Sequence, residues 1–467
     1  MVAAHEIGCA ASAAPPCRKG SAHQINRLSA SFGCRAGSRS PLSGRVRRGT
    51  REGRPLGRAS VANSEETRRR VSPSQPIVCR SAAPSSQPRD MFVEQPIKPW
   101  LDVQRAALLT REEFGFTAHT VTELISYDDR NFKVQLARED PDWERHPHGF
   151  VLKVTNWIES QQTEFLESVS RLMSEVSVHV QCQLPVLSKE GRHFVVQRFP
   201  IGGPESTFVK ECAVRLFTFL PGRTLNRRKV NDRLCLTWGD LLGRIHRTIQ
   251  EPERYPTLLS RYTPWSLWSV TELVGLVDNT VDTHQDRTLV HSVLAAFTQL
   301  QPQLRSLPTA VLHGDLNENN VLTRPKGDDS GSERDEEVYG VLDWGDVHGG
   351  PRVLDLAVLL AYVFLAPGDR SPEENAGLAL SGYLRHVPGE AATMPLLKTL
   401  VAARLCQSLV KGLESFRKNP DNQYVLSTQE SGWWCLRRLW NTPNELLLRT
   451  WKGVIAEADE GRGATST

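Results

Sequence analysis

The sequence lacks several patterns that would narrow its function at once. None of its nine cysteines forms a Cys-x-x-Cys pair, which argues against a zinc site and favours free thiols in a reducing compartment. Neither G-x-G-x-x-G nor G-x-x-x-x-G-K-[ST] occurs, so the common glycine-rich phosphate loops are excluded. The longest apolar run, 356–366, is shorter than the roughly 20 residues that cross a bilayer. It predicts a buried helix, and we expect no membrane partner.

Positive charge is scarce in most of the chain. The formal net charge of the 467 residues is +4, but residues 1–90 hold 16 Lys and Arg against 5 Asp and Glu. The remaining residues hold 41 Lys and Arg against 48 Asp and Glu. An acidic folded part argues against a nucleic-acid partner and weakly favours a cationic small substrate.

The first part of the chain has few aromatic residues and no sustained hydrophobic periodicity. Because such a segment cannot bury enough apolar surface to offset the entropy of ordering it, we predict a disordered basic extension over residues 1–92. Its Arg-rich, acid-poor composition is also typical of a mitochondrial transit peptide. Gly and Pro interrupt its basic run at 45–58, so we expect a cytoplasmic protein instead. Met91 leaves open that the extension is an upstream stretch that is not always made.

Residues 311–322, Val-Leu-His-Gly-Asp-Leu-Asn-Glu-Asn-Asn-Val-Leu, carry the most informative motif. Asp315 and Asn320 stand five residues apart in it, and a second apolar run ends in Asp343. Phosphoryl transfer needs a carboxylate to deprotonate a hydroxyl and oxygen ligands for the magnesium ion that bridges the phosphates. We therefore predict Asp315 as the catalytic base and Asn320 and Asp343 as the metal ligands.

Several other polar residues are expected to have structural roles. A lone Asp or Asn is more often a turn residue than a ligand. His313 is expected to pack and hydrogen-bond inside the loop, and His246 is also expected to be structural. Asp355 is expected to tie the catalytic loop down. For Asp346, a position close to the metal and a helix cap remain open alternatives.

Residues 150–155, Phe-Val-Leu-Lys-Val-Thr, predict a strand with a lysine in its middle. A buried ammonium group is unfavourable unless it is paired, so Lys153 is predicted to contact the phosphates of a nucleotide. The alternative is an edge strand with the amine in solvent. An amphipathic helix is predicted over 159–176, and Glu164 and Glu167 on it are candidate partners of the lysine.

Residues 127–131 hold turn formers between two predicted strands, at 117–124 and 133–136, and so predict a hairpin tip. On spacing alone, an ordinary surface hairpin and a cover for phosphates are equal alternatives. A last strand at 213–219 is followed by Pro221-Gly222, which predicts a hinge between two lobes.

The His-Gly-Asp loop, residues 341–362 and the segments 126–132, 150–154 and 214–223 together resemble the aminoglycoside phosphotransferase-like kinases. The resemblance implies an α+β, bilobal protein-kinase-like fold. Its small antiparallel-sheet N-lobe would span 93–220, its large mainly helical C-lobe 221–458, and a disordered tail 459–467. The activation-loop features of protein kinases are absent, which favours a small acceptor.

The same resemblance implies roles for particular residues. It selects Glu167 as the partner of Lys153, and it places the nucleotide base against the backbone near Thr218 and Leu220. The residues that it gives to the phosphate-covering tip are Tyr127, Asp128, Asp129 and Asn131.

Within the family, the pattern is most similar to the members that phosphorylate 5-hydroxy-L-lysine. That similarity implies this amino alcohol as acceptor, Mg²⁺ as cofactor and GTP as donor, with ATP as the alternative. Homoserine, choline, ethanolamine and aminoglycosides remain open as acceptors because no motif for the acceptor pocket is readable. A catalytically silent nucleotide-binding module that interacts through the basic tail is a second class. The joint presence of Asp315, Asn320, Asp343 and Lys153 argues against it.

Overall fold

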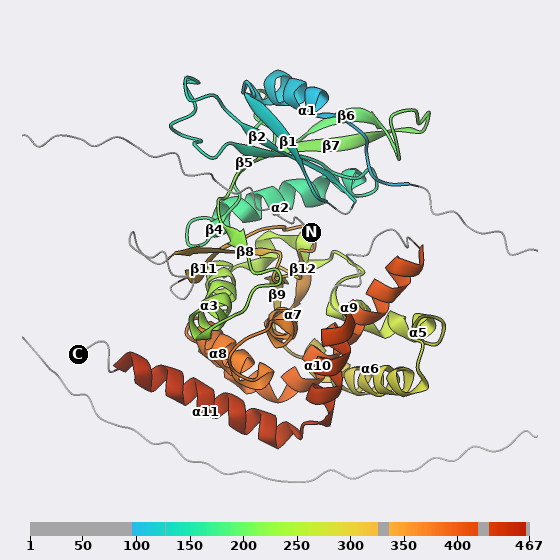
Figure 1. Cartoon of the computed structure of the whole chain (residues 1–467), viewed down its shortest axis with the longest axis vertical. Helices are drawn as coiled ribbons and strands as arrows, with labels where there is room; N and C mark the ends of the chain where they lie inside the picture. The colour runs from blue at the N-terminus through green and yellow to red at the C-terminus, as the bar shows by residue number, and fades with distance from the viewer. Residues whose placement is uncertain (1–95, 127, 326–335, 419–428, 464–467) are drawn as a thin grey trace, which may run out of the picture. The chain divides into compact units, whose positions relative to one another are not determined.

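The computed structural model describes residues 96–126, 128–325, 336–418 and 429–463, which form a small sheet-containing lobe and a large, mainly helical lobe (Figure 1). The predicted α+β bilobal architecture is confirmed. The predicted disordered extension, residues 1–92, lies outside the described residues. So do Tyr127 of the hairpin tip and residues 326–335.

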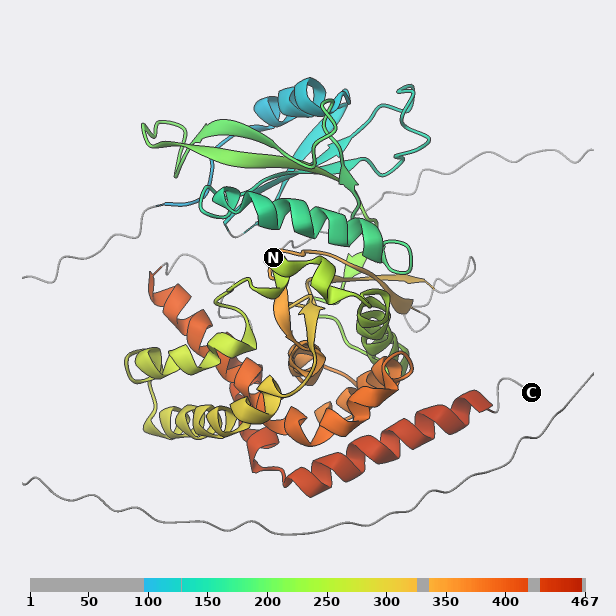
Figure 2. The same cartoon turned by 180° about the vertical axis from the view of Figure 1, so that it is seen from behind.

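One antiparallel sheet forms the small lobe, in the order β1-β2-β3-β7-β5 with β6 paired to β7. Helix α1 lies on one face of this sheet, and α2 lies on the other face, between the sheet and the large lobe (Figure 2). The elements of the lobe are α1 (Val103–Leu109), a π-helical turn (Thr110–Phe114), β1 (Thr120–Leu124), β2 (Arg130–Gln135), β3 (Phe150–Val154), a 3-10 turn (Glu159–Gln161), α2 (Thr163–Val176), β5 (Pro185–Val186), β6 (Val195–Pro200) and β7 (Val209–Thr218).

Strand β3 lies in the interior of the sheet, between β2 and β7. The register places Lys153 between Asn131 on β2 and Arg215 on β7. Its neighbours Leu152 and Val154 are fully buried. This position rules out the alternative of an edge strand with the lysine in solvent.

The helix predicted over 159–176 is divided in two. A 3-10 turn covers Glu159–Gln161, and α2 begins at Thr163. Ser160 fixes the turn, because its hydroxyl accepts from the Ala213 N–H on β7 and donates to the Asn156 carbonyl. The periodic apolar residues of α2 are buried as predicted: Phe165, Leu166, Val169, Leu172, Met173 and Val176.

The large lobe surrounds helix α7, whose residues are almost all buried and whose position confirms the apolar run 356–366 as a core helix. Its elements are β8 (Arg223–Thr224), α3 (Asp232–Thr248), α4 (Pro256–Leu259), α5 (Val274–Thr280), α6 (His284–Arg305), β9 (Thr309–Leu312), β10 (Val321–Pro325), β11 (Glu336–Val341), β12 (His348–Pro351), α7 (Arg352–Leu365), α8 (Pro372–Leu384), α9 (Met394–Lys418), α10 (Gln429–Asn441) and α11 (Asn444–Gly463), while β4 (Gln181–Cys182) joins the β11 edge from the lobe boundary. Within the described ranges, no helix combines the length and apolarity that a bilayer span requires.

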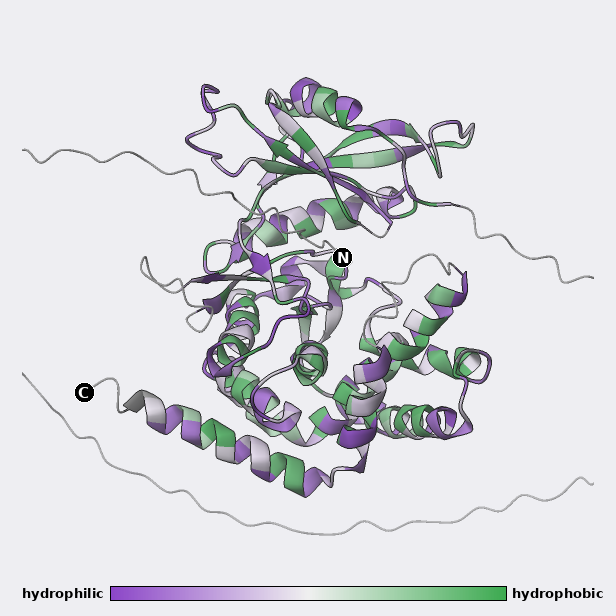
Figure 3. Cartoon of the chain, in the orientation of Figure 1, coloured by the Kyte–Doolittle hydropathy of each residue, from purple (hydrophilic) through white to green (hydrophobic). Residues whose placement is uncertain are grey.

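Helix α11 continues past residue 458, where the sequence predicts a disordered tail. It alternates hydrophobic and hydrophilic segments (Figure 3) and buries Leu447, Trp451 and Val454 against the lobe. The helix extends to Gly463, five residues beyond the predicted boundary at 458. Residues 464–467 lie outside the described part of the chain.

The five cysteines in the described residues are free and buried: Cys182, Cys212, Cys235, Cys406 and Cys435. Burial raises the pKa of the Cys182, Cys212 and Cys235 thiols to about 12. At neutral pH these side chains therefore behave as small apolar groups.

Helices α3 and α8 pack closely because glycines line their contact. A Cβ on Gly382 would lie 1.9 Å from the Leu236 carbonyl oxygen. We predict that Gly382→Ala lowers the free energy of unfolding by about 1–3 kcal/mol, because the helices must separate. On α11 a Cβ at Gly453 meets nothing within 4 Å, and Gly453→Ala should stabilise by up to about 1 kcal/mol. Urea denaturation followed by tryptophan fluorescence measures the free energy of unfolding of both variants. Equal values for Gly382→Ala and Gly453→Ala would contradict the close packing of α3 and α8.

Candidate active site

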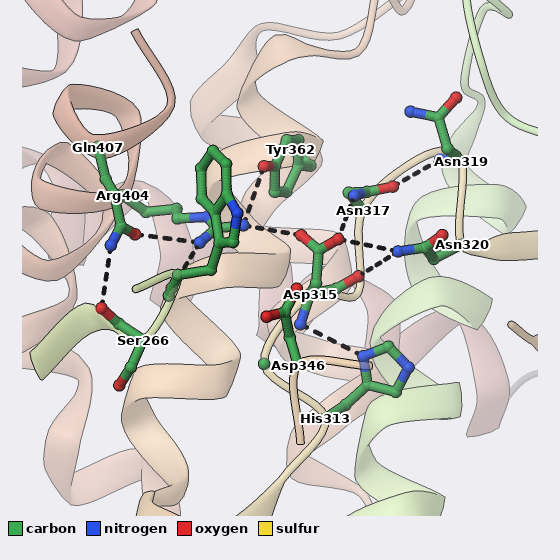
Figure 4. Close-up of polar contacts among 12 residues, drawn as sticks. Ser266, His313, Asp315, Asn317, Asn319, Asn320, Asp346, Tyr362, Arg404 and Gln407 are labelled. Carbon is green, nitrogen blue, oxygen red and sulfur yellow. Dashed lines mark hydrogen bonds and ion pairs between the residues drawn. The ribbon is translucent and has the colours of Figure 1, made fainter. Parts of the chain in front are cut away.

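The loop between β9 and β10 presents Asp315 to the site (Figure 4). Gly314 adopts a left-handed conformation with φ of 84°. A Cβ at this position would lie 2.4 Å from the Asp346 carbonyl oxygen. Only glycine meets both requirements, because it has no Cβ and tolerates positive φ.

Asp355, in the first turn of α7, anchors this loop. Its two carboxylate oxygens accept the backbone N–H groups of His313, at 2.8 Å, and Gly314, at 2.9 Å. His246 on α3 contacts the same carboxylate at 3.0 Å. Burial alone would raise the pKa of Asp355, but these hydrogen bonds outweigh it and lower the pKa to about 2. The expectations that Asp355 ties the loop down and that His246 is structural are confirmed.

His313 is hydrogen-bonded on both ring nitrogens. Its Nδ1 lies 3.3 Å from the Asp315 N–H, which donates to it, so Nε2 carries the proton and donates to the Leu342 carbonyl at 3.1 Å. Burial lowers its pKa and keeps the ring neutral. His313 therefore connects the backbone at Asp315 to the backbone at Leu342, and it has the structural role that the sequence predicts.

Three donors surround the Asp315 carboxylate. Its Oδ2 accepts from the amides of Asn317, at 2.8 Å, and Asn320, at 2.9 Å. Its Oδ1 accepts from Arg404 on α9 at 2.7 Å. Burial raises the pKa of Asp315 to about 7, although the Arg404 guanidinium opposes the rise. A carboxylate tuned in this way is suited to general-base chemistry near neutral pH.

The hairpin of β10 and β11 brings Asn320 next to Asp343. Val321 pairs with Val341, and the Leu342 N–H donates to the Asn320 carbonyl at 2.8 Å. Asp343 adopts a left-handed conformation with φ of 56°, which is unfavourable for most residues and milder for Asp and Asn. The predicted pair of metal ligands is therefore brought together.

Lys153 connects this pair to the small lobe. Its Nζ lies 2.8 Å from Asp129 Oδ2 and 4.0 Å from Asp343 Oδ1. Burial opposes a charge on the lysine, but the two carboxylates outweigh it and raise its pKa to about 12. A pocket lies at this point, and it is lined from both lobes by Asn131, Val151, Lys153, Glu159, Phe165, Met173, Gln183, Arg215, Phe217, Asp343, Trp344 and Gly345.

The predicted ion pair between Glu167 and Lys153 is not formed. Glu167 contacts His193 at 2.9 Å and Arg171 at 3.0 Å instead. Asp129 takes the place beside the lysine. Glu159 lines the pocket, and burial together with the Asp129 charge raises its pKa to about 7.

The other predicted nucleotide-binding residues have mixed outcomes. Asn131 is buried beside Lys153 and lines the pocket. Asp129 is held by the side chain and backbone of Asn156, whereas Asp128 is partly exposed next to it.

Two backbone N–H groups at the end of β7 are already used. The Thr218 N–H donates to the Leu184 carbonyl, and the Phe219 N–H donates to the Gly149 carbonyl. A contact between a nucleotide base and the backbone near Thr218 and Leu220 stays a prediction.

Two buried arginines of the site lie outside the residues that the sequence motifs predict. Arg215 lines the pocket opposite Lys153 and donates to Thr155 Oγ1 at 3.2 Å. Arg404 pairs with Asp315 from 89 residues further along the chain. Each is a lone charge within an apolar segment, and the same signal had selected Lys153.

Asp346 caps no helix in the described residues. Its Oδ1 accepts from the Thr263 hydroxyl at 2.8 Å, and α7 begins later, at Arg352. Of the two open alternatives, the helix cap is therefore wrong, and proximity to the metal stays a prediction.

Residues 142–395 match the model of the phosphotransferase enzyme family. The chain belongs to this family. It is accordingly a phosphotransferase with a hydroxyl group as acceptor, and the loop, hairpin and lysine described above belong to the family's matched region.

The chain is also similar to curated members over most of their length. It is 28% identical to the hydroxylysine kinase of Xenopus laevis, over 76% of this chain and 94% of that protein. It is 26% identical to the hydroxylysine kinase of Mus musculus, over 76% and 93%. With the homoserine kinase of Pseudomonas aeruginosa it shares 27% identity over 42% of this chain and 58% of that protein.

Among solved structures, the chain is similar to amicoumacin kinase hAmiN in complex with AMP-PNP, Ca²⁺ and Ami. The two are 17% identical, with a TM-score of 0.48, over 76% of this chain and 94% of that one.

We predict that Asp355→Asn destabilises the protein by roughly 2–4 kcal/mol at pH 7, because it leaves a buried backbone donor unmatched. Ionised Asp355 stabilises fully above its unfolded pKa of about 4, and this contribution disappears as the pH falls through about 2. The difference in the free energy of unfolding between variant and wild type should therefore become smaller as the pH falls below about 4. Chemical denaturation at pH 7 and pH 3 measures it.

Asp278→Asn is the matched control, since Asp278 is an exposed carboxylate that also contacts a histidine. It should change stability by less than about 0.5 kcal/mol. An equal loss in the two variants would contradict the anchoring role of Asp355.

Proposed function

We propose that the chain is a small-molecule kinase that transfers the γ-phosphoryl group of a nucleoside triphosphate to the hydroxyl of 5-hydroxy-L-lysine. The observation that carries the proposal is the chain of contacts that joins Asp315, Asn320, Asp343 and Lys153. The Asn320 amide contacts Asp315 at 2.9 Å, the β10–β11 hairpin brings Asn320 next to Asp343, and Lys153 Nζ lies 4.0 Å from Asp343 in the pocket between the lobes. A base, two oxygen ligands and a phosphate-binding cation are the set that phosphoryl transfer requires.

In the proposed reaction, the acceptor hydroxyl donates its proton to Asp315 as its oxygen bonds to the γ-phosphorus. The bond between that phosphorus and the nucleoside diphosphate breaks in the same step. Lys153 binds the phosphate oxygens and stabilises the negative charge on the leaving group. Arg215, which lies opposite Lys153 in the sheet, adds positive potential to the same pocket.

The residues present fit a magnesium ion. Both hydrogens of the Asn320 amide point to Asp315, toward its carbonyl and its Oδ2, each at 2.9 Å. The Asn320 Oδ1 is thereby fixed, and it is buried without a hydrogen-bond donor in the described residues. This amide oxygen and the Asp343 carboxylate are ligands of the kind that Mg²⁺ prefers. When bound, the ion would neutralise charge on the phosphates.

Similarity supports hydroxylysine as acceptor, and GTP stays the expected donor with ATP as the alternative. Hydroxylysine kinases are matched over more than nine tenths of their length, whereas the homoserine kinase is matched over 58%. Homoserine is also an amino acid with a hydroxyl group, so it is the second candidate acceptor. A silent nucleotide-binding module would show no transfer to either compound.

We predict that the protein phosphorylates 5-hydroxy-L-lysine with GTP and Mg²⁺, and that Asp315→Asn lowers kcat at least about 100-fold, the scale of a lost general base. The measurement is a panel with GTP or ATP against hydroxylysine, homoserine, choline and kanamycin. Asp282→Asn, at an exposed position paired with Arg417, is the control and should keep full activity. Undiminished turnover by Asp315→Asn would refute the proposed base.

We predict that Asp343→Asn abolishes Mg²⁺-dependent nucleotide binding, because a neutral amide replaces the charged ligand. Asparagine tolerates the left-handed backbone at this position, so the substitution isolates the loss of charge. Calorimetric titration of GTP with and without EDTA measures the effect. In wild type, EDTA should weaken binding, whereas in the variant it should make no further difference. A variant with the wild-type response to EDTA would exclude Asp343 as a ligand.

A further inference from the structure

Arg404 is one of the largest fully buried side chains in the described residues, with 1% of its surface exposed. It belongs to α9, in the helical part of the large lobe, and none of the sequence motifs includes it. A buried guanidinium is costly unless its donors are matched, so its partners indicate its role.

Arg404 is held in place by groups other than Asp315. Its Nη1 donates to the Trp265 carbonyl at 2.9 Å and to Gln407 Oε1 at 3.0 Å. Gln407 is itself fixed, because its amide donates to the carbonyls of Pro264 and Ser266 (Figure 4). The orientation of the guanidinium therefore does not depend on the carboxylate that it meets.

The second nitrogen, Nη2, points to the reacting group. It donates to Asp315 Oδ1 at 2.7 Å and to the Tyr362 hydroxyl at 3.1 Å. A carboxylate has about four acceptor positions, two on each oxygen. Asn317 and Asn320 occupy both positions on Oδ2, and Arg404 occupies one on Oδ1. One position on Oδ1 is left.

We propose that Arg404 is a positioning residue for phosphoryl transfer, which turns Asp315 so that the acceptor hydroxyl meets the remaining position on Oδ1. This inference rests on the proposed role of Asp315 as the base. Without Arg404, both positions on Oδ1 are open and the carboxylate rotates against the amides on Oδ2. The hydroxyl then loses its alignment with the γ-phosphorus, while the nucleotide keeps its own contacts.

The first test compares Arg404→Met and Arg404→Lys with wild type, using 5-hydroxy-L-lysine as acceptor. Arg404→Met should lower kcat about 100-fold, as misalignment by about 1 Å does, and change the KM for GTP less than about twofold. Arg404→Lys keeps one donor group, so its kcat should lie between those of wild type and Arg404→Met. Lys411→Met is the control, since Lys411 is on the same helix and donates to the Pro264 carbonyl without touching Asp315. A raised KM for GTP with an unchanged kcat would overturn the proposal.

The second test places each Arg404 substitution in the Asp315→Asn background. If Arg404 acts only through Asp315, the double variant should be no more than about threefold slower than Asp315→Asn alone. A merely structural arginine would multiply the two losses, and that result would refute the positioning role.

Two measurements keep the tests decisive. Thermal unfolding shows whether Arg404→Met folds; if it does not, Arg404→Lys carries the same comparison. GTP hydrolysis with water as the acceptor gives the same ranking of variants without depending on the identity of the substrate. Undiminished hydrolysis and transfer by Asp315→Asn would defeat the proposed function, whereas a slow Asp315→Asn beside a fully active Arg404→Met would defeat the positioning role alone.

Discussion

The carboxylate of Asp355 joins three parts of the large lobe that are distant in the sequence. It comes from α7, it fixes the backbone of the catalytic loop at His313 and Gly314, and it meets His246 of α3. Each buried N–H left unmatched would cost about 1–3 kcal/mol. The position of Asp315 therefore depends on the charge of Asp355, which is fully buried. His313 also connects the catalytic loop to the β10–β11 hairpin, because its ring hydrogen-bonds the Leu342 carbonyl.

The buried charges between the lobes are also paired, because an unpaired buried charge is unfavourable. Lys153 is paired with Asp129 from its own lobe and lies within 4.0 Å of Asp343 from the other. Arg215 adds a second buried cation in the neighbouring strand. Asp129 and Asp343 thus accompany Lys153, and their charges keep its ammonium group protonated despite its burial.

The sequence predicted the elements and motifs that depend on local pattern. The strand around Lys153, the apolar face of α2 and the buried helix α7 all follow from hydrophobic pattern. It failed where distant contacts decide the geometry. Glu167 pairs with His193, 26 positions away, instead of Lys153, and the approach of α9 brings Arg404 to Asp315 across 89 positions. No short-range pattern encodes either effect, although a lone arginine in an apolar segment marks the second.

The burial of the cysteines has a practical consequence for the study of lobe movement. Since burial raises the pKa of these thiols, alkylating reagents find few thiolates in the described part of the chain at neutral pH. With Cys9, Cys17, Cys34 and Cys79 replaced, a fluorophore could be attached selectively to one new surface thiol on each lobe. Energy transfer between two such dyes would then test whether the distance between the lobes changes when a nucleotide binds.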